Sequence, residues 1–213
     1  MAEKYNRFAP FYDALSGEFP VYRAGRLLAV RDLDLAEGAQ VLDVGCGTGL
    51  NFGLLQRAVG PTGWIVGIDR SPQMLARARR KAERRGWSNV ILIEGDATTL
   101  SVEKVREAVR ARGGRGSSDA ALATYALSLM PGWEHAWERM KHLVRPAGTL
   151  SVVDMQEPQG AFAVFGPLAR LACRWGGADI TAAPWRGVER DCVAVRTASA
   201  RGDHLQVRTG RRP

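Results

Sequence analysis

The chain has 213 residues, 46% of them hydrophobic, with a formal net charge of +8, and this length suits one α/β-sized domain with a single core better than two domains. Its three cysteines lie far apart without a CxxC pair, which argues against a disulfide framework and against a zinc site, and we expect no bound metal. No N-terminal apolar segment follows a basic start and no run of about 18 apolar residues occurs, so we expect a soluble, cytoplasmic protein without a signal peptide or membrane span.

The first 36 residues predict one or two helices that stand outside the alternation of strands and helices in the rest of the chain. We expect a single domain, residues 1–213, in which residues 1–36 form a helical cover and residues 37–213 form an α/β core. Residues 1–22 are not needed to complete a sheet, and they carry four aromatic side chains close together: Tyr5, Phe8, Phe11 and Tyr12. This segment is expected to act as a lid over a ligand site.

Apolar runs alternate with helical patterns through the middle of the chain. The five strand-like runs are residues 40–44, 64–69, 90–96, 120–127 and 149–155. Helical patterns follow these runs, and Ser71 with Pro72 marks the beginning of one helix, because Pro suits the first helical turn. Strands that alternate with helices predict a doubly wound, Rossmann-like α/β fold with a parallel sheet.

Two segments depart from this alternation. Residues 101–118 contain an amphipathic stretch over roughly 101–111 and then the run RARGGRGSS, which has low-complexity character and is expected to be a mobile loop. Residues 192–210 predict two strands joined at Arg201-Gly202-Asp203, a hairpin with no helix between its strands. The sheet is therefore expected to end in an antiparallel pair.

The segment VLDVGCGTG, residues 41–49, places three glycines directly after the first strand. Glycines at this point let a ligand approach the backbone near the carboxyl ends of the strands. The fingerprint of dinucleotide-binding proteins is GxGxxG, whereas this chain has GxGxG followed by Leu50. Asp43, just before the turn, would repel a pyrophosphate and attract a cationic group, so the turn suits a ligand without phosphate.

Carboxylates also end the next two strands. Asp69 ends the second strand, where it can accept hydrogen bonds from both hydroxyls of a ribose, and Asp96 ends the third, where it can accept one from the amino group of an adenine ring. Together with Asp43, these positions imply a ligand that carries an ammonium group, a ribose and an adenine. S-adenosylmethionine has these groups and no phosphate, and it is the cofactor that we expect.

Three motifs resemble the cofactor motifs of class I S-adenosylmethionine-dependent methyltransferases: VLDVGCGTG, VGIDRSPQML and IEGDATTL. The segment 5–17 and the segment LVRPAGTLSVVDM, residues 143–155, are similar to the branch of that family related to ubiquinone and menaquinone biosynthesis. The resemblance implies a seven-stranded sheet whose last strand is antiparallel, which agrees with the hairpin. It also implies direct in-line transfer of the methyl group from the cofactor, with S-adenosylhomocysteine as the product.

The resemblance implies a role in cofactor binding for each motif residue. Asp43 would face the ammonium group through the glycine turn or a water molecule, Asp69 would hold the ribose, and Asp96 with Ala97 would bind the adenine. The other cofactor-binding positions are Gly45, Cys46, Gly47, Thr48 and Gly49 around the methionine part, Arg70 and Met74 beside the adenosine, and Tyr125 at the end of the fourth strand.

Some of these positions have a packing explanation as well. Gly49 would let the first helix pack on the sheet, Asp69 would cap the helix that follows it, and Cys46 is expected to be a small buried thiol and not a nucleophile. The chain also departs from the family after Asp96, where the helix and loop of residues 101–118 replace a shorter loop.

Methyl transfer demands little of the protein, because the sulfonium already activates the methyl group, and alignment with exclusion of water supplies much of the rate. A general base is needed only where the acceptor must lose a proton. The candidate bases near the expected mouth of the site are Tyr12, Tyr125 and His135, with Tyr5 and Tyr22 as further tyrosines. His135 and His142 also suit a solvated helix face. Trp133 and Trp185 would either wall an apolar substrate pocket or pack in the core.

We expect a methyltransferase for a small-molecule acceptor, since the sequence has no recognisable substrate domain or nucleic-acid-binding module. The basic residues of 77–85 leave a second hypothesis open, methylation of a lipid or quinone by a protein in peripheral contact with an anionic membrane. The same residues also suit the solvated face of an amphipathic helix, which we favour. A third hypothesis is a cofactor-binding regulator without turnover. The acceptor and the oligomeric state are not predicted.

Overall fold

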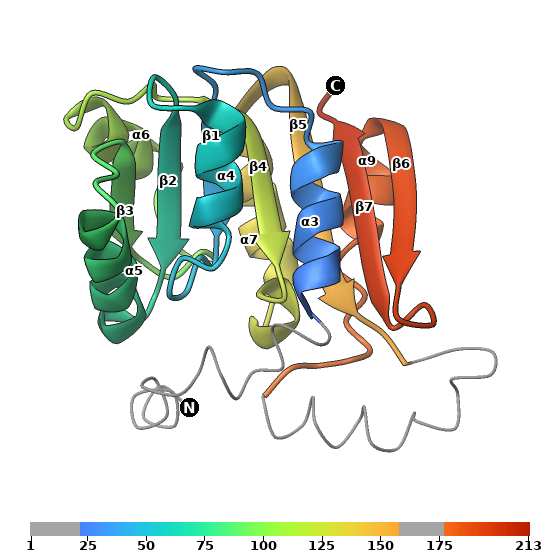
Figure 1. The fold of residues 1–213 in the computed structure, drawn as a ribbon. Coiled ribbons are helices and arrows are strands. Elements are labelled where there is room, and N and C mark those ends of the chain that lie inside the picture. The colour runs from blue at the N-terminus through green and yellow to red at the C-terminus, as the bar shows by residue number, and fades with distance from the viewer. Residues whose placement is uncertain (1–21, 158–176) are drawn as a thin grey trace.

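The computed structural model describes residues 22–157 and 177–213, which form three layers with a sheet in the middle (Figure 1). The sheet has seven strands in the order β3-β2-β1-β4-β5-β7-β6. These strands are β1 (Gln40–Val44), β2 (Trp64–Asp69), β3 (Val90–Glu94), β4 (Ser118–Thr124), β5 (Val144–Met155), β6 (Val193–Ala200) and β7 (Leu205–Arg211). Strands β1 to β5 pair in parallel, and β7 pairs antiparallel with both β5 and β6. The predicted doubly wound sheet with an antiparallel last strand is confirmed.

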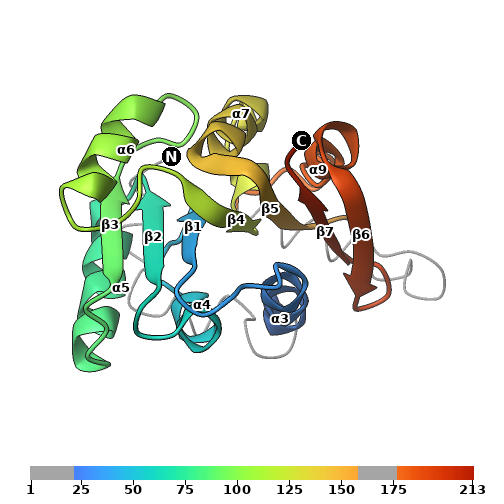
Figure 2. The ribbon, with the colours of Figure 1, turned by 90° about the horizontal axis from the view of Figure 1, so that it is seen from above.

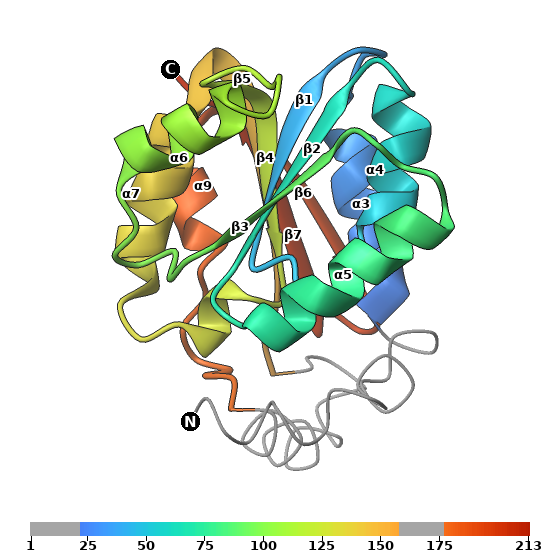
Figure 3. The same cartoon turned by 90° about the vertical axis from the view of Figure 1, so that its left-hand side faces the viewer.

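Helices cover both faces of this sheet (Figures 2 and 3). One face carries α3 (Arg23–Asp32), α4 (Phe52–Val59) and α5 (Pro72–Arg84), and the other carries α6 (Val102–Arg110), α7 (Trp133–Leu143) and α9 (Arg186–Asp191). Each face has its own apolar core, with Leu55 and Ala78 on the first side and Val105 and Trp137 on the second. Because the central strands are covered on both faces, all five residues of β1 are buried.

The hairpin at the end of the chain is also confirmed. Strands β6 and β7 are joined by a turn in which Arg201, Gly202 and Asp203 have φ values of 57°, 64° and 60°. A turn with several residues in the left-handed region matches the twist of the strands it joins. The hairpin therefore forms without a helix, and β7 is inserted between β5 and the edge strand β6.

The structure corrects the expected bounds of three strands. Strand β3 ends at Glu94, two residues before the expected end at residue 96. Strand β4 ends at Thr124, although a run to residue 127 was expected, because Tyr125 has a φ of 56° and η3 (Leu127–Leu129) is a turn of 3-10 helix. Strand β5 begins at Val144, five residues before the expected beginning, since Val144 pairs with Ser118 ahead of the regular register. The end of β4 and the beginning of β5 both depend on residues that are distant in the sequence.

Residues 111–117 form the expected loop between α6 and β4, and hydrogen bonds hold it against β1. Its mobility stays a prediction. The buried side chain of Gln40 donates to Arg115 O at 2.7 Å and to Ser118 Oγ at 3.0 Å, and it accepts from Arg115 N at 2.6 Å. A buried amide needs such partners, because an unsatisfied polar group inside the protein is costly. The glycine-rich run is thus held on the sheet by β1.

The expected lid, residues 1–22, lies outside the described residues except for Tyr22, and it stays a prediction. Helix α3 packs on β5, β6 and β7, in the same layer as α4 and α5, so it covers the sheet and continues that layer (Figure 2). Among the helices within residues 22–157 and 177–213, none has the length and the apolar composition that a bilayer-spanning helix needs.

Candidate functional site

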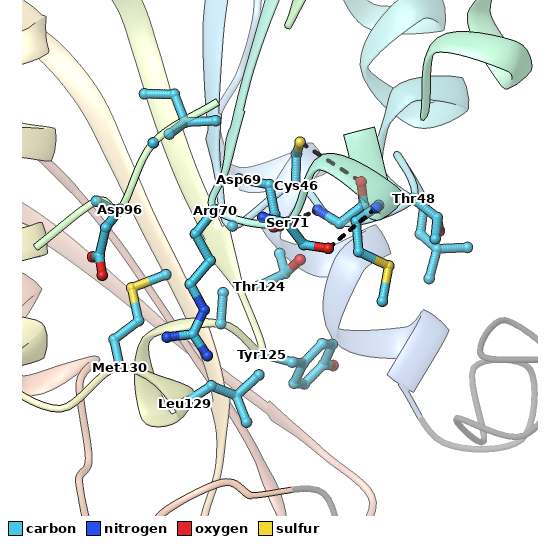
Figure 4. A pocket seen from close by; sticks show the side chains of 18 of the residues that line it. Cys46, Thr48, Asp69, Arg70, Ser71, Asp96, Thr124, Tyr125, Leu129 and Met130 are labelled. Atoms are coloured by element: carbon cyan, nitrogen blue, oxygen red, sulfur yellow. Dashed lines mark hydrogen bonds between the residues drawn. The ribbon is translucent and has the colours of Figure 1, made fainter. Parts of the chain in front are cut away.

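A cavity of about 380 Å³ opens at the carboxyl ends of β1, β2, β3 and β4 (Figure 4). Its wall includes most of the residues that the sequence predicted for the cofactor: Gly45, Cys46, Gly47, Thr48, Asp69, Arg70, Met74, Asp96, Ala97 and Tyr125. Asp43 and Gly49 are the two predicted positions that are absent from the described lining. The strand order reverses between β1 and β4, and an open parallel sheet offers its ligand crevice at this point.

The glycine turn is held by the neighbouring strand. Gly45 N and Cys46 N both donate to Ile68 O, at 2.8 Å and 3.0 Å, and Gly47 N donates to Asp69 Oδ2 at 2.8 Å. A Cβ atom on Gly45 would lie 2.4 Å from the Cβ of Ala126, whereas one on Gly47 would meet no atom within 4 Å. Gly45 is therefore needed for contact with the opposite wall, and Gly47 leaves backbone open to the cavity.

Asp69 links this turn to the beginning of α5. Its Oδ2 accepts from Gly47 N, and its Oδ1 accepts from Ser71 N at 2.9 Å. Burial raises the pKa of the Asp69 carboxyl, and the two backbone hydrogen bonds oppose that rise. Because an ionised carboxylate has about four acceptor positions, Asp69 keeps acceptor capacity for a hydroxyl group of a ligand.

Asp96 follows β3 and lies half-buried in the cavity wall. Its Oδ1 accepts from Thr98 Oγ1 at 2.6 Å and from Thr98 N at 2.8 Å. The hydrogen bond from the Thr98 hydroxyl contributes most to a pKa of the Asp96 carboxyl that is below its usual value. The carboxylate is therefore ionised near neutral pH, and Oδ2 is available to an amino group.

Asp43 is buried beneath the cavity and does not contact it directly. Both of its oxygens accept from Asn51 Nδ2, at 3.0 Å and 3.1 Å, and Asn51 Nδ2 also lies 3.0 Å from Thr124 Oγ1. Arg26 of α3 donates to Asn51 Oδ1 at 3.0 Å and to Thr124 Oγ1. Arg26 and Thr124 line the cavity, so the hydrogen bonds through Asn51 connect Asp43 to the cavity wall.

The sequence did not predict Arg26, Asn51 or Thr124 as part of the site. Arg26 lies 25 residues before Asn51 and 98 residues before Thr124, so no local pattern joins them. Asn51 directly precedes α4 and is 1% exposed. The one local signal for this network was therefore Asn51, a polar residue close to the glycine motif.

Asp43 gives the stability of the protein a specific pH dependence. Burial raises the pKa of this carboxyl from 3.8 to about 7, while the hydrogen bond from Asn51 and the charge of Arg26 oppose the rise. A carboxyl with a raised pKa in the folded state contributes stability that is complete below the unfolded pKa and is lost as the pH rises through the folded pKa. The free energy of unfolding of Asp43→Asn, relative to that of the unchanged chain, should therefore rise between about pH 4 and pH 8. Urea unfolding across this range measures it, and parallel pH profiles would contradict the assignment.

Gly49 and Cys46 have packing roles. Gly49 has a φ of 74°, and a Cβ atom there would lie 2.6 Å from the ring of Phe52. The Cys46 side chain is 6% exposed and contacts Gly67, where a Cβ atom would lie 2.9 Å from Cys46 Sγ. Burial raises the pKa of the Cys46 thiol well above its usual value, so the thiol stays protonated and is a poor nucleophile.

The three candidate bases have different outcomes. Tyr125 lines the cavity, but its hydroxyl donates to Tyr22 O at 2.8 Å, and Figure 4 shows it directed towards α3. His135 is exposed on α7 and is not among the described residues of the cavity wall. Tyr12 and Tyr5 lie outside the described residues. His142 is exposed as well, as its alternative as a solvated histidine requires.

The two tryptophans belong to the apolar core. Trp185 is 5% exposed within the core on the α7 side, and Trp133 packs against the same core. Neither lines the described cavity, so the packing alternative holds for both. Within residues 22–157 and 177–213, no group of three or more His, Cys, Asp or Glu side chains is arranged to hold a metal ion.

Known proteins share both the sequence pattern and the fold. A family model described as a methyltransferase domain matches residues 35–175. A demethylmenaquinone methyltransferase of Staphylococcus aureus is 30% identical over 149 residues, which are 69% of this chain and 56% of that protein. The chain thus spans little more than half the length of the curated relatives it matches.

Solved structures share the fold at lower identity. The N-methyltransferase NodS of Bradyrhizobium japonicum, in complex with S-adenosyl-L-homocysteine, has a TM-score of 0.70 at 16% identity and covers 100% of this chain and 98% of its own. The cyclase SpnF has a TM-score of 0.65 at 19% identity and covers 88% of this chain and 79% of its own. Because one of these proteins is a cyclase, the fold alone does not define the reaction.

The sheet order is that of the Rossmann-like fold which S-adenosylmethionine-dependent methyltransferases share with these solved structures. The chain belongs to the methyltransferase-domain family, as the match over residues 35–175 establishes. The predicted resemblance and the predicted cofactor class are confirmed.

Proposed function

We propose that the cavity binds S-adenosylmethionine and that the chain transfers the methyl group to a small-molecule acceptor by direct in-line attack. The observation that carries this proposal is the meeting of Asp69, Asp96 and the open backbone of Gly47 in one cavity. Asp69 would accept from the ribose hydroxyls and Asp96 from the adenine amino group. Arg26, which lines the same cavity, would bind the carboxylate of the methionine part.

The cofactor supplies an activated methyl group, so the chain has to orient the two reactants and exclude water. We assign the exclusion of water to the ring of Tyr125 and to Leu129 and Met130, which are apolar parts of the cavity wall. The hydroxyl of Tyr125 is engaged by Tyr22 O, and we assign it no role as a base. Tyr12 stays the candidate base for an acceptor that must lose a proton.

Calorimetry with S-adenosylhomocysteine tests the cofactor. We expect micromolar binding, about −8 kcal/mol, and no binding of NAD, because the glycine turn has GxGxG in place of the dinucleotide fingerprint GxGxxG. The reverse preference would contradict the proposal. Formation of S-adenosylhomocysteine from S-adenosylmethionine in the presence of an acceptor would separate an enzyme from a cofactor-binding regulator.

A second candidate function is methylation of a quinone or lipid at an anionic membrane. It is supported by the 30% identity to a demethylmenaquinone methyltransferase and by four exposed arginines on and just after α5: Arg79, Arg80, Arg84 and Arg85. If these arginines contact acidic lipid, each should add about 1 kcal/mol of binding at low salt. Co-sedimentation with phosphatidylserine vesicles across a salt series measures this, with Arg80→Glu as the charge reversal. If vesicle binding changes neither with salt nor with Arg80→Glu, a soluble small molecule stays the preferred class of acceptor.

A further inference from the structure

Asp154, near the end of β5, is completely buried, and the function proposed above does not use it. Its Oδ1 accepts from Ser128 Oγ at 2.7 Å and from Met155 N at 2.9 Å, and its Oδ2 accepts from Ser128 N at 3.1 Å. Burial raises the pKa of the Asp154 carboxyl to about 6, and these three hydrogen bonds oppose the rise. A buried carboxylate is costly, so the donors that satisfy it are held firmly.

Two of these donors belong to Ser128, which lies in the middle of η3. Residues 126–130, the cavity loop, follow β4, and three of them line the cavity: Ala126, Leu129 and Met130. Ser128 also joins a third segment, because its carbonyl accepts from Asp179 N at 2.9 Å. Asp154 therefore anchors the cavity loop from behind, without lining the described cavity itself.

The cavity loop lies directly opposite the glycine turn. A Cβ atom on Gly45 would lie 2.4 Å from the Cβ of Ala126 and 3.4 Å from Cε of Met130. Met130 and Asp96, the carboxylate assigned to the adenine, both line this cavity (Figure 4). A shift of the cavity loop would consequently change the width of the cavity opposite the glycine turn.

We propose that Asp154 and Ser128 are positioning residues that set the width of the cavity and, through Met130 and Leu129, the fit of the adenine ring. The inference rests on the proposed function, because the ligand concerned is the adenosyl part of the cofactor. Its basis is a buried contact between β5 and the cavity loop, 26 residues apart in the chain.

Calorimetry with S-adenosylhomocysteine on the full chain tests the proposal through a double-mutant cycle. Asp154→Asn should raise the Kd about tenfold. The amide nitrogen of the new side chain is a donor, so it would face a donor of Ser128 where a carboxylate oxygen accepted a hydrogen bond before. Ser128→Ala should raise it less, since the backbone donor stays. The double variant should bind about as weakly as Asp154→Asn, because the two substitutions remove the same contact, the one between Asp154 and Ser128.

Ser151→Ala is the matched control. Ser151 is also buried in β5, three residues before Asp154, and its hydroxyl bonds to Thr209 Oγ1 at 2.8 Å, away from the cavity. The control should lose stability in urea unfolding and keep its Kd within about twofold. A purely structural role of Asp154 would predict this same pattern for Asp154→Asn, whereas the positioning role predicts the higher Kd.

The outcomes are distinguishable from failure of the proposed function. If the unchanged chain does not bind S-adenosylhomocysteine, the proposed function fails. If it binds and folded Asp154→Asn binds equally well, the positioning role is overturned. Should Asp154→Asn not fold, Ser128→Ala decides, and an unchanged Kd there overturns the inference. Faster amide hydrogen exchange in residues 126–130 of Ser128→Ala, without faster exchange in β1, would support it.

Discussion

Gly47→Ala is expected to weaken S-adenosylhomocysteine binding at least about tenfold, or about 1.4 kcal/mol, by placing a methyl group where the ligand must approach the backbone. Gly47 has a φ of 54°, and the structure holds no atom within 4 Å of the added methyl carbon. The folded protein alone should therefore lose only the conformational cost of this φ value, about 1–2 kcal/mol. Calorimetry and urea unfolding measure the two effects separately.

Gly86→Ala is the control for this experiment, because Gly86 has a φ of 66° and a Cβ atom there also meets nothing within 4 Å, but it lies beyond α5 and outside the described cavity wall. It should cost similar stability and leave the affinity unchanged. Gly45→Ala should lose both stability and affinity, since its methyl carbon would lie 2.4 Å from the Cβ of Ala126. Equal affinities for Gly47→Ala and Gly86→Ala would mean that no ligand contacts this turn.

Asp69→Ala should weaken S-adenosylhomocysteine binding by about 1.5–3 kcal/mol, because two ribose hydroxyls lose their charged acceptor. The structure adds a second effect: Gly47 N and Ser71 N lose their acceptor as well, so the glycine turn and the beginning of α5 should loosen. A lower urea midpoint and faster hydrogen exchange in both segments are expected. An unchanged affinity would show that the ribose binds elsewhere.

Asp119→Ala is the control that separates the loss of ribose binding in Asp69→Ala from its loss of stability. Asp119 is a half-buried carboxylate that accepts from Gln40 N at 2.8 Å and pairs with Arg145 at 2.9 Å, and it lies outside the described lining of the cofactor cavity. Its removal should reduce stability and leave the affinity for S-adenosylhomocysteine unchanged. If both variants lose affinity in proportion to stability, the effect of Asp69 is structural and the ribose assignment fails.

Sequence patterns alone predicted the alternation of strands and helices, the final hairpin, Asp69 at the end of β2 and Asp96 close behind β3. These features depend on local apolar periodicity, on turn residues and on one geometric rule, since the carboxyl ends of parallel strands share one edge of the sheet. The same reasoning had Asp43 face the ammonium group through the glycine turn or a water molecule, and the structure buries Asp43 beneath the cavity with Asn51.

The groups that complete the site could be identified from the folded arrangement alone. Arg26, Thr124, Ser128 and Asp154 come from four segments of the chain, and the residues that they contact lie 25 to 98 positions away. The contact that holds the loop after α6 escaped prediction for the same reason, because Gln40 lies 75 residues before Arg115. A buried polar group takes whichever partner the packing brings near it, so its partner depends on the folded arrangement and not on the residues beside it in the sequence.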